Sequence, residues 1–183
     1  MNTTREMPGW FDFADLYDLA VAEASHGSKF LEIGCWLGKS TCYLADQVRR
    51  SKKSVLITVI DTFKGVPGDE LQELLGPYGG SVRTAFEKNL EMSGVRDLVS
   101  ILEENSAAAH HHFAPQSLDF IFIDADHSYP AVKRDIRNFL PKVKPGGILA
   151  GHDYGHSPQV RRAVDEALGP CPASASSWAY RVR

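Results

Sequence analysis

The chain has 183 residues, of which 43% are hydrophobic and 23% charged, and its formal net charge is −3. These values are ordinary for one globular domain with a core of its own, and we treat residues 1–183 as a single domain. The net charge and the lack of a basic stripe argue against nucleic acid as a partner. The three cysteines form no CxxC pair, which argues against a disulfide framework.

The N-terminus shows no signal-peptide pattern, and no apolar stretch approaches the roughly 20 residues that a membrane span needs. We therefore expect a cytoplasmic protein without a membrane partner.

Hydrophobic patterning divides the chain into alternating helices and strands. Residues 1–27 are expected to form an N-terminal helical segment, in which an amphipathic helix from Trp10 to about Ser25 packs its aromatic side chains, including that of Trp10, into the core. Residues 62–80, rich in glycine and proline, form a long loop that we expect to be a lid, and residues 144–147 form a turn. The predicted strands cover residues 29–33, 54–60, 98–102, 118–123, 148–150 and 178–182, and the other predicted helices cover residues 39–50, 82–92, 106–112, 129–140 and 160–168.

This alternation is typical of an α/β domain with a doubly wound, mostly parallel sheet and helices on both faces. In such sheets, ligands bind beyond the carboxyl ends of the strands. The residue types that bind ligands gather after the predicted strands, in segments 32–38, 103–106, 124–127 and 152–154 and at Asp61. We expect all five to lie on one edge of the sheet.

The loop after the first strand reads Glu32-Ile33-Gly34-Cys35-Trp36-Leu37-Gly38. Its glycines allow a sharp turn and close approach of a ligand, and it leads into a helix N-terminus, which attracts anionic groups. The spacing is not the GxGxxG of a dinucleotide site, and Ile33 stands where a P-loop needs glycine. Asp61 ends the second strand, where a carboxylate can accept hydrogen bonds from ribose hydroxyls. Together, the two features predict a nucleoside cofactor.

Four segments in order resemble the motifs of class I S-adenosylmethionine-dependent methyltransferases. They are Phe30–Ser40, Val59–Phe63, Phe120–Tyr129 and Pro145–Tyr154, and the resemblance extends over about residues 28–168. It implies a Rossmann-like fold with S-adenosylmethionine as cofactor. Within the superfamily, the segments are most similar to a bacterial subgroup that includes sugar and antibiotic O-methyltransferases.

The resemblance also implies roles for individual residues. Glu32 and Gly34 would line the methionine end of the cofactor, Asp61 would bind the ribose, and Asn105 and Ser106 would lie near the adenine. The predicted cofactor-binding residues are Glu32, Gly34, Cys35, Trp36, Gly38, Ser40, Asp61, Thr62, Asn105, Ser106 and Asp124.

A second polar group follows the fourth and fifth predicted strands. Metal-dependent O-methyltransferases of this shape place a divalent cation between carboxylates at these positions, which here are Asp124 and Asp153. Oxygen ligands favour Mg²⁺, whereas His152, which stands where some relatives carry a second acid, favours a transition metal. We predict a divalent cation, Mg²⁺ or another, on these three residues. The alternative is that Asp124 contacts the cofactor and Asp153 caps a turn or helix.

A cation bound to an acceptor hydroxyl would lower its pKa, and Asp126 or His127 could then remove the proton as general base. Both are therefore predicted to be catalytic. The leading hypothesis is methyl transfer to a hydroxyl oxygen of a small molecule or glycan. A nicotinamide-dependent oxidoreductase and a non-catalytic cofactor-binding domain are the alternatives.

The end of the chain bears on assembly. Class I methyltransferases usually finish with two strands after the last helix, and only residues 178–182 are a clear candidate. The second strand would be very short, absent or supplied by a partner chain, so a homo-oligomer is one expected arrangement.

Overall fold

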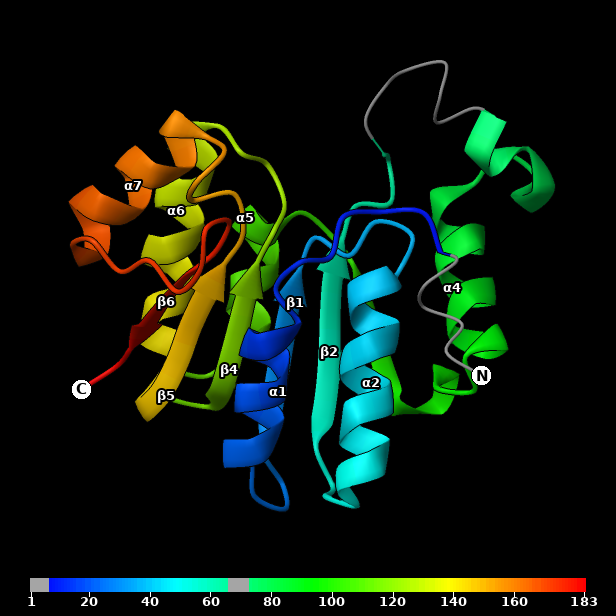
Figure 1. The fold of residues 1–183 in the computed structure, drawn as a ribbon, viewed down its shortest axis with the longest axis horizontal. Helices are drawn as coiled ribbons and strands as arrows, with labels where there is room; N and C mark the ends of the chain where they lie inside the picture. The colour runs from blue at the N-terminus through cyan, green and yellow to red at the C-terminus, as the bar shows by residue number, and fades with distance from the viewer. Residues whose placement is uncertain (1–6, 66–72) are drawn as a thin grey trace.

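One six-stranded sheet organises the computed structural model, which describes residues 7–65 and 73–183 (Figure 1). The strand order is β3-β2-β1-β4-β5-β6, with five parallel strands and β6 antiparallel to β5. The bounds are β1 (Lys29–Ile33), β2 (Leu56–Asp61), β3 (Val99–Glu103), β4 (Leu118–Ile123), β5 (Val143–Gly151) and β6 (Trp178–Arg181). The predicted doubly wound, mostly parallel sheet is confirmed.

Helices cover both faces of the sheet (Figure 1). They are α1 (Ala14–Glu23), α2 (Lys39–Ser51), α4 (Val82–Met92), α5 (Ser106–Ala109), α6 (Tyr129–Phe139) and α7 (Pro158–Leu168). Short 3₁₀ turns lie at Gly76–Tyr78, Arg96–Leu98, His110–His112 and Leu140–Lys142. The layered α/β arrangement follows from the alternation of elements in the sequence.

The strands are buried on both faces, and alternate side chains belong to different cores. Phe30 and Phe120 pack with α1, α2 and α4, whereas their neighbours Leu31 and Ile121 pack with α6 and α7. This division explains why the central strands read as nearly continuous apolar runs.

The N-terminal helix is shorter than predicted. It begins at Ala14, so Trp10 lies outside it and is 83% exposed. The predicted core position of Trp10 is therefore wrong, although Phe13 is buried as expected. The physical reason is that residues 7–13 run across the edge of the sheet, where the Lys39 ammonium donates a hydrogen bond to the Gly9 carbonyl.

The predicted turn at residues 144–147 lies inside β5. Leu118 of β4 pairs with Val143, and Phe120 pairs with Ile148, so the intervening residues of β5 form a bulge. The glycine and proline signal marked this irregularity correctly, but the strand continues on both sides of it.

Candidate active site

Three backbone hydrogen bonds align the ends of four neighbouring strands, β2, β1, β4 and β5. The Gly34 N–H donates to the Ile60 carbonyl at 2.8 Å, and the Asp124 N–H donates to the Ile33 carbonyl at 2.8 Å. The His152 N–H donates to the carbonyl of Ile123 at 3.2 Å. The ladder thus continues past the strand ends and sets the glycine loop, Asp124 and His152 side by side on one edge.

Gly34 is fixed by steric contact with the neighbouring strand end. Its φ is +84°, and a Cβ there would lie 2.0 Å from the Asp124 carbonyl oxygen. Gly38, at φ +89°, would bring a Cβ within 2.8 Å of the Phe86 ring. Both glycines are therefore needed for the path of the backbone at this loop.

Glu32 is buried beneath the glycine loop and accepts hydrogen bonds from three hydroxyls. Tyr17 donates at 2.9 Å, Ser40 donates at 2.5 Å, and Thr41 also donates. Burial raises the pKa of Glu32 to about 7, against the lowering effect of the three hydroxyl donors. The carboxyl therefore positions the loop and α2 from below.

Asp61 organises the glycine loop through its backbone. One carboxylate oxygen accepts the N–H groups of Cys35 and Trp36 at 2.8 and 3.1 Å, and the other accepts the Phe63 N–H at 2.8 Å. A carboxylate has about four acceptor positions, and these three bonds occupy most of them.

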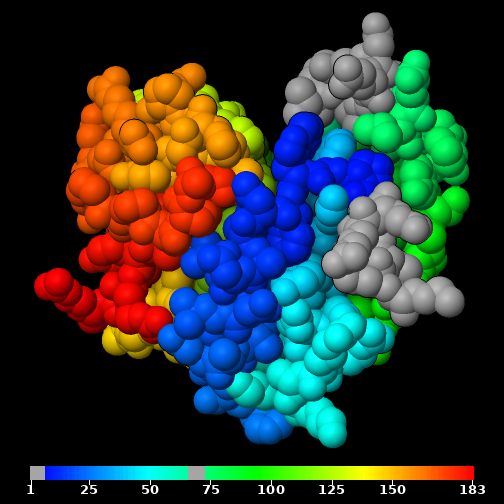
Figure 2. All heavy atoms as spheres, viewed as in Figure 1, coloured from blue at the N-terminus to red at the C-terminus, as the bar shows by residue number. Residues whose placement is uncertain are grey.

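The N-terminal segment, residues 7–13, covers the outer side of this loop. The Trp10 and Trp36 rings are stacked with centroids 6.0 Å apart, and Gly9 lies against Trp36. Figure 2 shows a hollow at this edge, between the orange atoms of the α7 side and the blue atoms of the N-terminal segment.

Three residues that follow strands at this edge have unusual backbone conformations. Trp36 has φ 43°, Phe63 has φ 51° and Asp153 has φ 61°, a region that residues other than glycine rarely occupy. Such conformations persist where the surrounding structure imposes them, and they gather at functional sites.

The predicted adenine-side residues follow β3. The Asn105 side chain caps α5 by accepting the Ala107 N–H at 2.9 Å, and the buried Ser106 hydroxyl donates to Asp135 at 2.9 Å. Both side chains thus have partners within the protein. Cys35 is buried, and burial raises the pKa of its thiol, so its sulfur is a packing group.

Thr62 follows β2 at the start of the predicted lid. Its hydroxyl accepts a weak hydrogen bond from the Lys64 N–H at 3.5 Å. Residues 73–75 are helical, and residues 66–72 of the predicted lid lie outside the described residues.

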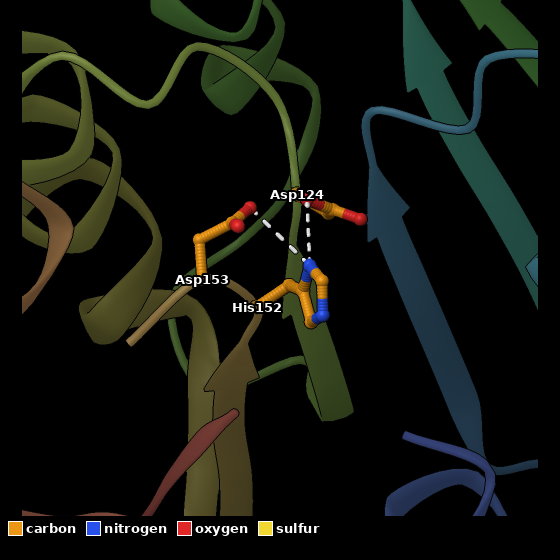
Figure 3. A group of neighbouring side chains, drawn as sticks. All are labelled: Asp124, His152 and Asp153. Atoms are coloured by element: carbon orange, nitrogen blue, oxygen red, sulfur yellow. Dashed lines mark ion pairs between the residues drawn. The ribbon is translucent and has the colours of Figure 1, made fainter. Parts of the chain in front are cut away.

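Asp124, His152 and Asp153 come together where β4 and β5 end (Figure 3). One ligand atom from each lies within 4.8 Å of the others. The His152 Nδ1 is 3.2 Å from an Asp153 oxygen and 3.8 Å from an Asp124 oxygen. The three predicted metal ligands therefore form one group with nitrogen and oxygen donors.

His127 lies on the same group. Its Nε2 is 3.3 Å from Asp124 and 3.2 Å from Asp153, and the hydrogen bond to Asp124 raises the pKa of its ring above the usual value. Burial opposes the charge on His152, yet Asp153, Asp124 and Asp12 raise the pKa of that ring to about 9. The hydrogen bond from His152 lowers the pKa of Asp153. The group is therefore arranged to hold positive charge between carboxylates.

Asp126 faces another way. Its carboxylate accepts the Ser128 N–H at 2.8 Å in the turn before α6, and this bond lowers its pKa. The structure thus places His127 within the acidic group and Asp126 at a turn beside it.

Sequence reasoning missed three residues that hold the site. Tyr17 and Thr41 bind Glu32, and Asp12 binds His152 at 2.9 Å across 140 positions of the chain. Thr41 could have been found, because it follows Ser40 on the first turn of α2. No sequence signal links Asp12 to His152.

The fold and this edge define a Rossmann-like methyltransferase. A family model described as a methyltransferase domain matches residues 31–154, and the chain belongs to this family. A methyltransferase of this family implies S-adenosylmethionine as methyl donor. Among the described residues, none of the helices is both long and apolar enough to cross a bilayer.

Solved structures agree with this fold. The O-methyltransferase NovP matches 100% of this chain and 87% of its own, with a TM-score of 0.69 and 19% identity. CalS11, a TDP-rhamnose 3′-O-methyltransferase, matches 92% of this chain and 77% of its own, with a TM-score of 0.61 and 16% identity. An rRNA methylase from Streptococcus thermophilus matches 97% of this chain and 100% of its own, with a TM-score of 0.63 and 10% identity.

A curated relative matches a shorter region. Uncharacterized protein R132 of Acanthamoeba polyphaga mimivirus is 36% identical over 62 residues, which are 32% of this chain and 28% of that protein. The match spans less than a third of the relative's length, so it adds nothing on substrate.

Proposed function

We propose that this protein transfers the methyl group of S-adenosylmethionine to a hydroxyl oxygen of a small molecule or glycan, with the help of a divalent cation. The observation that carries the proposal is the adjacency of two groups. The Gly34 loop meets the Asp124 backbone directly, and the Asp124 side chain belongs to the group with His152 and Asp153. A cofactor on the loop and an acceptor on the acidic group would therefore be neighbours.

The proposed reaction needs few groups from the protein. The acceptor oxygen attacks the methyl carbon, an O–C bond forms while the S–C bond breaks, and S-adenosylhomocysteine leaves. The chain supplies alignment of the two reactants, which accounts for much of the rate in such a displacement. Gly34 and Asp61 would hold the cofactor, and Asp124 and Asp153 would face the acceptor.

The residues present fit a divalent cation. Asp124, His152 and Asp153 offer two carboxylate oxygens and one imidazole nitrogen that all lie within 4.8 Å of one another. A cation there would lower the pKa of the acceptor hydroxyl and fix its position.

We propose His127 as the general base that accepts the proton of the acceptor hydroxyl. Its ring is half exposed and lies between Asp124 and Asp153, so the proton of the acceptor hydroxyl could pass to its neutral form. Asp126 is engaged in its turn, and its lowered pKa makes it the weaker base of the two.

The structural neighbours and the net charge support the class of acceptor. NovP and CalS11 are O-methyltransferases, and CalS11 acts on TDP-rhamnose. The net charge of −3 favours a small molecule or glycan over a nucleic acid, although an rRNA methylase shares the fold. Membership of a methyltransferase family argues against the nicotinamide-dependent alternative, and a binding domain without catalysis is the second candidate.

The test has two stages. Calorimetry with S-adenosylhomocysteine should show binding, and no binding at high micromolar ligand would overturn the proposal. Labelled S-adenosylmethionine should then methylate members of a panel of nucleotide sugars and phenols, and EDTA should abolish the transfer. Binding without transfer to any acceptor would favour the non-catalytic domain. Transfer that survives complete chelation would refute a catalytic role for the cation.

A further inference from the structure

The His152 ring is held on two sides by the N-terminal segment. Its Nε2 lies 2.9 Å from the Asp12 carboxylate, and the Phe13 ring packs against it with centroids 4.9 Å apart. The imidazole is only 9% exposed. Its orientation is therefore set by residues 140 positions earlier in the chain.

The contact with Asp12 keeps a proton on Nε2, because a carboxylate can only accept and Nε2 must be the N–H donor in this pair. By the same argument, Nδ1 donates to Asp153 at 3.2 Å as long as no cation is bound. A cation at this position would replace the Nδ1 proton and take its lone pair, while Asp12 would hold the proton on Nε2. Figure 3 shows Nδ1 directed at Asp124 and Asp153, with the other nitrogen on the far side of the ring.

We propose that Asp12 is a positioning residue that makes the His152 Nδ1 a metal ligand, and that the resulting donor set selects Fe²⁺, Co²⁺ or Zn²⁺ over Mg²⁺. This inference rests on the cation of the proposed function. A ligating histidine commonly donates its other N–H to a carboxylate, which fixes the tautomer and raises the basicity of the ligand. An imidazole beside two carboxylates favours first-row transition ions, whereas Mg²⁺ prefers oxygen alone.

Asp12 is held in place by its neighbour Phe13, although the Asp12 side chain is 57% exposed. Phe13 is 1% exposed and stacks on Phe122 of β4 with centroids 4.4 Å apart, which anchors the segment next to the metal ligands. Because the carboxylate keeps much of its hydration, holding it beside His152 requires little desolvation.

The experiment measures metal binding directly, without turnover. Calorimetry and the visible d–d absorption of Co²⁺ are recorded for the wild type, for Asp12→Asn, and for Asp15→Asn, an exposed position on α1 that serves as control. Asp12→Asn should weaken Co²⁺ binding by about 10–100-fold. Asp15→Asn should leave it unchanged, and the wild type should bind Co²⁺ at least about tenfold more tightly than Mg²⁺.

Repeating the measurement in a His152→Asp variant distinguishes positioning of the His152 ring from a direct effect of the Asp12 charge on the cation. In His152→Asp there is no imidazole to orient, so adding Asp12→Asn should cause no further loss of Co²⁺ affinity. A purely electrostatic role would instead lower the affinity equally in both backgrounds. Binding of S-adenosylhomocysteine, measured in all variants, should stay within about twofold of the wild type, because in the described part of the chain Asp12 forms its hydrogen bond with His152 and none with the glycine loop.

The outcomes distinguish this inference from the proposed function. Equal Co²⁺ affinity in the wild type and Asp12→Asn overturns the role of Asp12 and leaves the cation in place. Equal affinity for Co²⁺ and Mg²⁺ overturns the selectivity. A wild type that binds S-adenosylhomocysteine but no divalent ion overturns both this inference and metal assistance, while methyl transfer itself would stand.

Discussion

The two halves of the site are built differently. The half proposed to bind the cofactor contains Glu32, Asp61 and the glycine loop. There, the Glu32 carboxylate accepts hydrogen bonds from three hydroxyls, and the Asp61 carboxylate accepts them from three backbone N–H groups. At the reaction half, Asp124 and Asp153 face the imidazoles of His127 and His152. One half is fixed by hydrogen bonds to buried hydroxyls and backbone N–H groups, and the other is a group of carboxylates and imidazoles that pair with one another.

Because of this difference, we expect amino-acid substitutions to have different effects in the two halves. Substitutions at the cofactor half should damage the fold and the loop together, because the same bonds serve both. Substitutions at the reaction half should spare the fold and change chemistry. Four substitutions would test this division.

Gly34→Ala should cause the greatest loss. The new Cβ would lie 2.0 Å from the Asp124 carbonyl oxygen at φ +84°, so the free energy of unfolding should fall by about 4 kcal/mol or the protein should fail to fold. Denaturant titration measures this. Gly27→Ala is the control, since Gly27 has φ +85° with open space around it and should cost only about 1 kcal/mol. Equal costs at the two glycines would contradict the steric argument.

The buried Glu32 should make the stability of the ligand-free protein depend on pH. Its pKa rises from 4.5 to about 7 on folding, so its contribution is complete below about pH 4.5 and is lost as the pH rises through 7. The total change is about 3 kcal/mol. Compared with Glu32→Gln, the wild type should lose stability over this range, as followed by urea unfolding at several pH values. The control Glu91→Gln, at an exposed position, should keep the pH dependence of the wild type. If Glu32→Gln kept it as well, Glu32 would not be its source.

Asp153→Asn should lower the rate of methyl transfer by about 10²-fold, because the acidic group loses a charge and a ligand. Asparagine tolerates the positive φ at this position, so the fold should be kept. Single-turnover assays with labelled cofactor measure the rate, and calorimetry should show S-adenosylhomocysteine affinity within about twofold of wild type. Asp97→Asn, at an exposed position near the opposite edge, is the control. A large loss of cofactor affinity in Asp153→Asn would break the division between the halves.

Asp61→Asn should weaken S-adenosylhomocysteine binding by about tenfold. The amide replaces one acceptor oxygen with a donor, so at least one backbone N–H of the loop loses its partner, and the charge opposite the ribose is removed. Calorimetry measures the affinity, with Asp46→Asn as control, a partly buried position on α2 whose carboxylate pairs with Arg49 and Arg50. An unchanged affinity would refute the ribose role of Asp61.

Sequence patterns alone predict the order of the elements and the edge of the sheet on which the candidate site residues lie. Apolar runs such as Leu118–Ile123 mark buried parallel strands, and Gly34 and Asp61 mark the loops that follow them. Local patterns suffice here, because parallel strands in a doubly wound sheet share one carboxyl edge. The ends of elements were less accurate, as at Trp10 and residues 144–147, because contacts from other elements decided them.

The pairing of the charged side chains could be seen only in the three-dimensional structure. Asp126 and His127 are neighbours in sequence, yet one caps a turn and the other joins the acidic group. Asp12 reaches His152 because the N-terminal segment crosses the sheet edge before α1 begins. Such partners depend on the path of the backbone in three dimensions, and no spacing in the sequence records them.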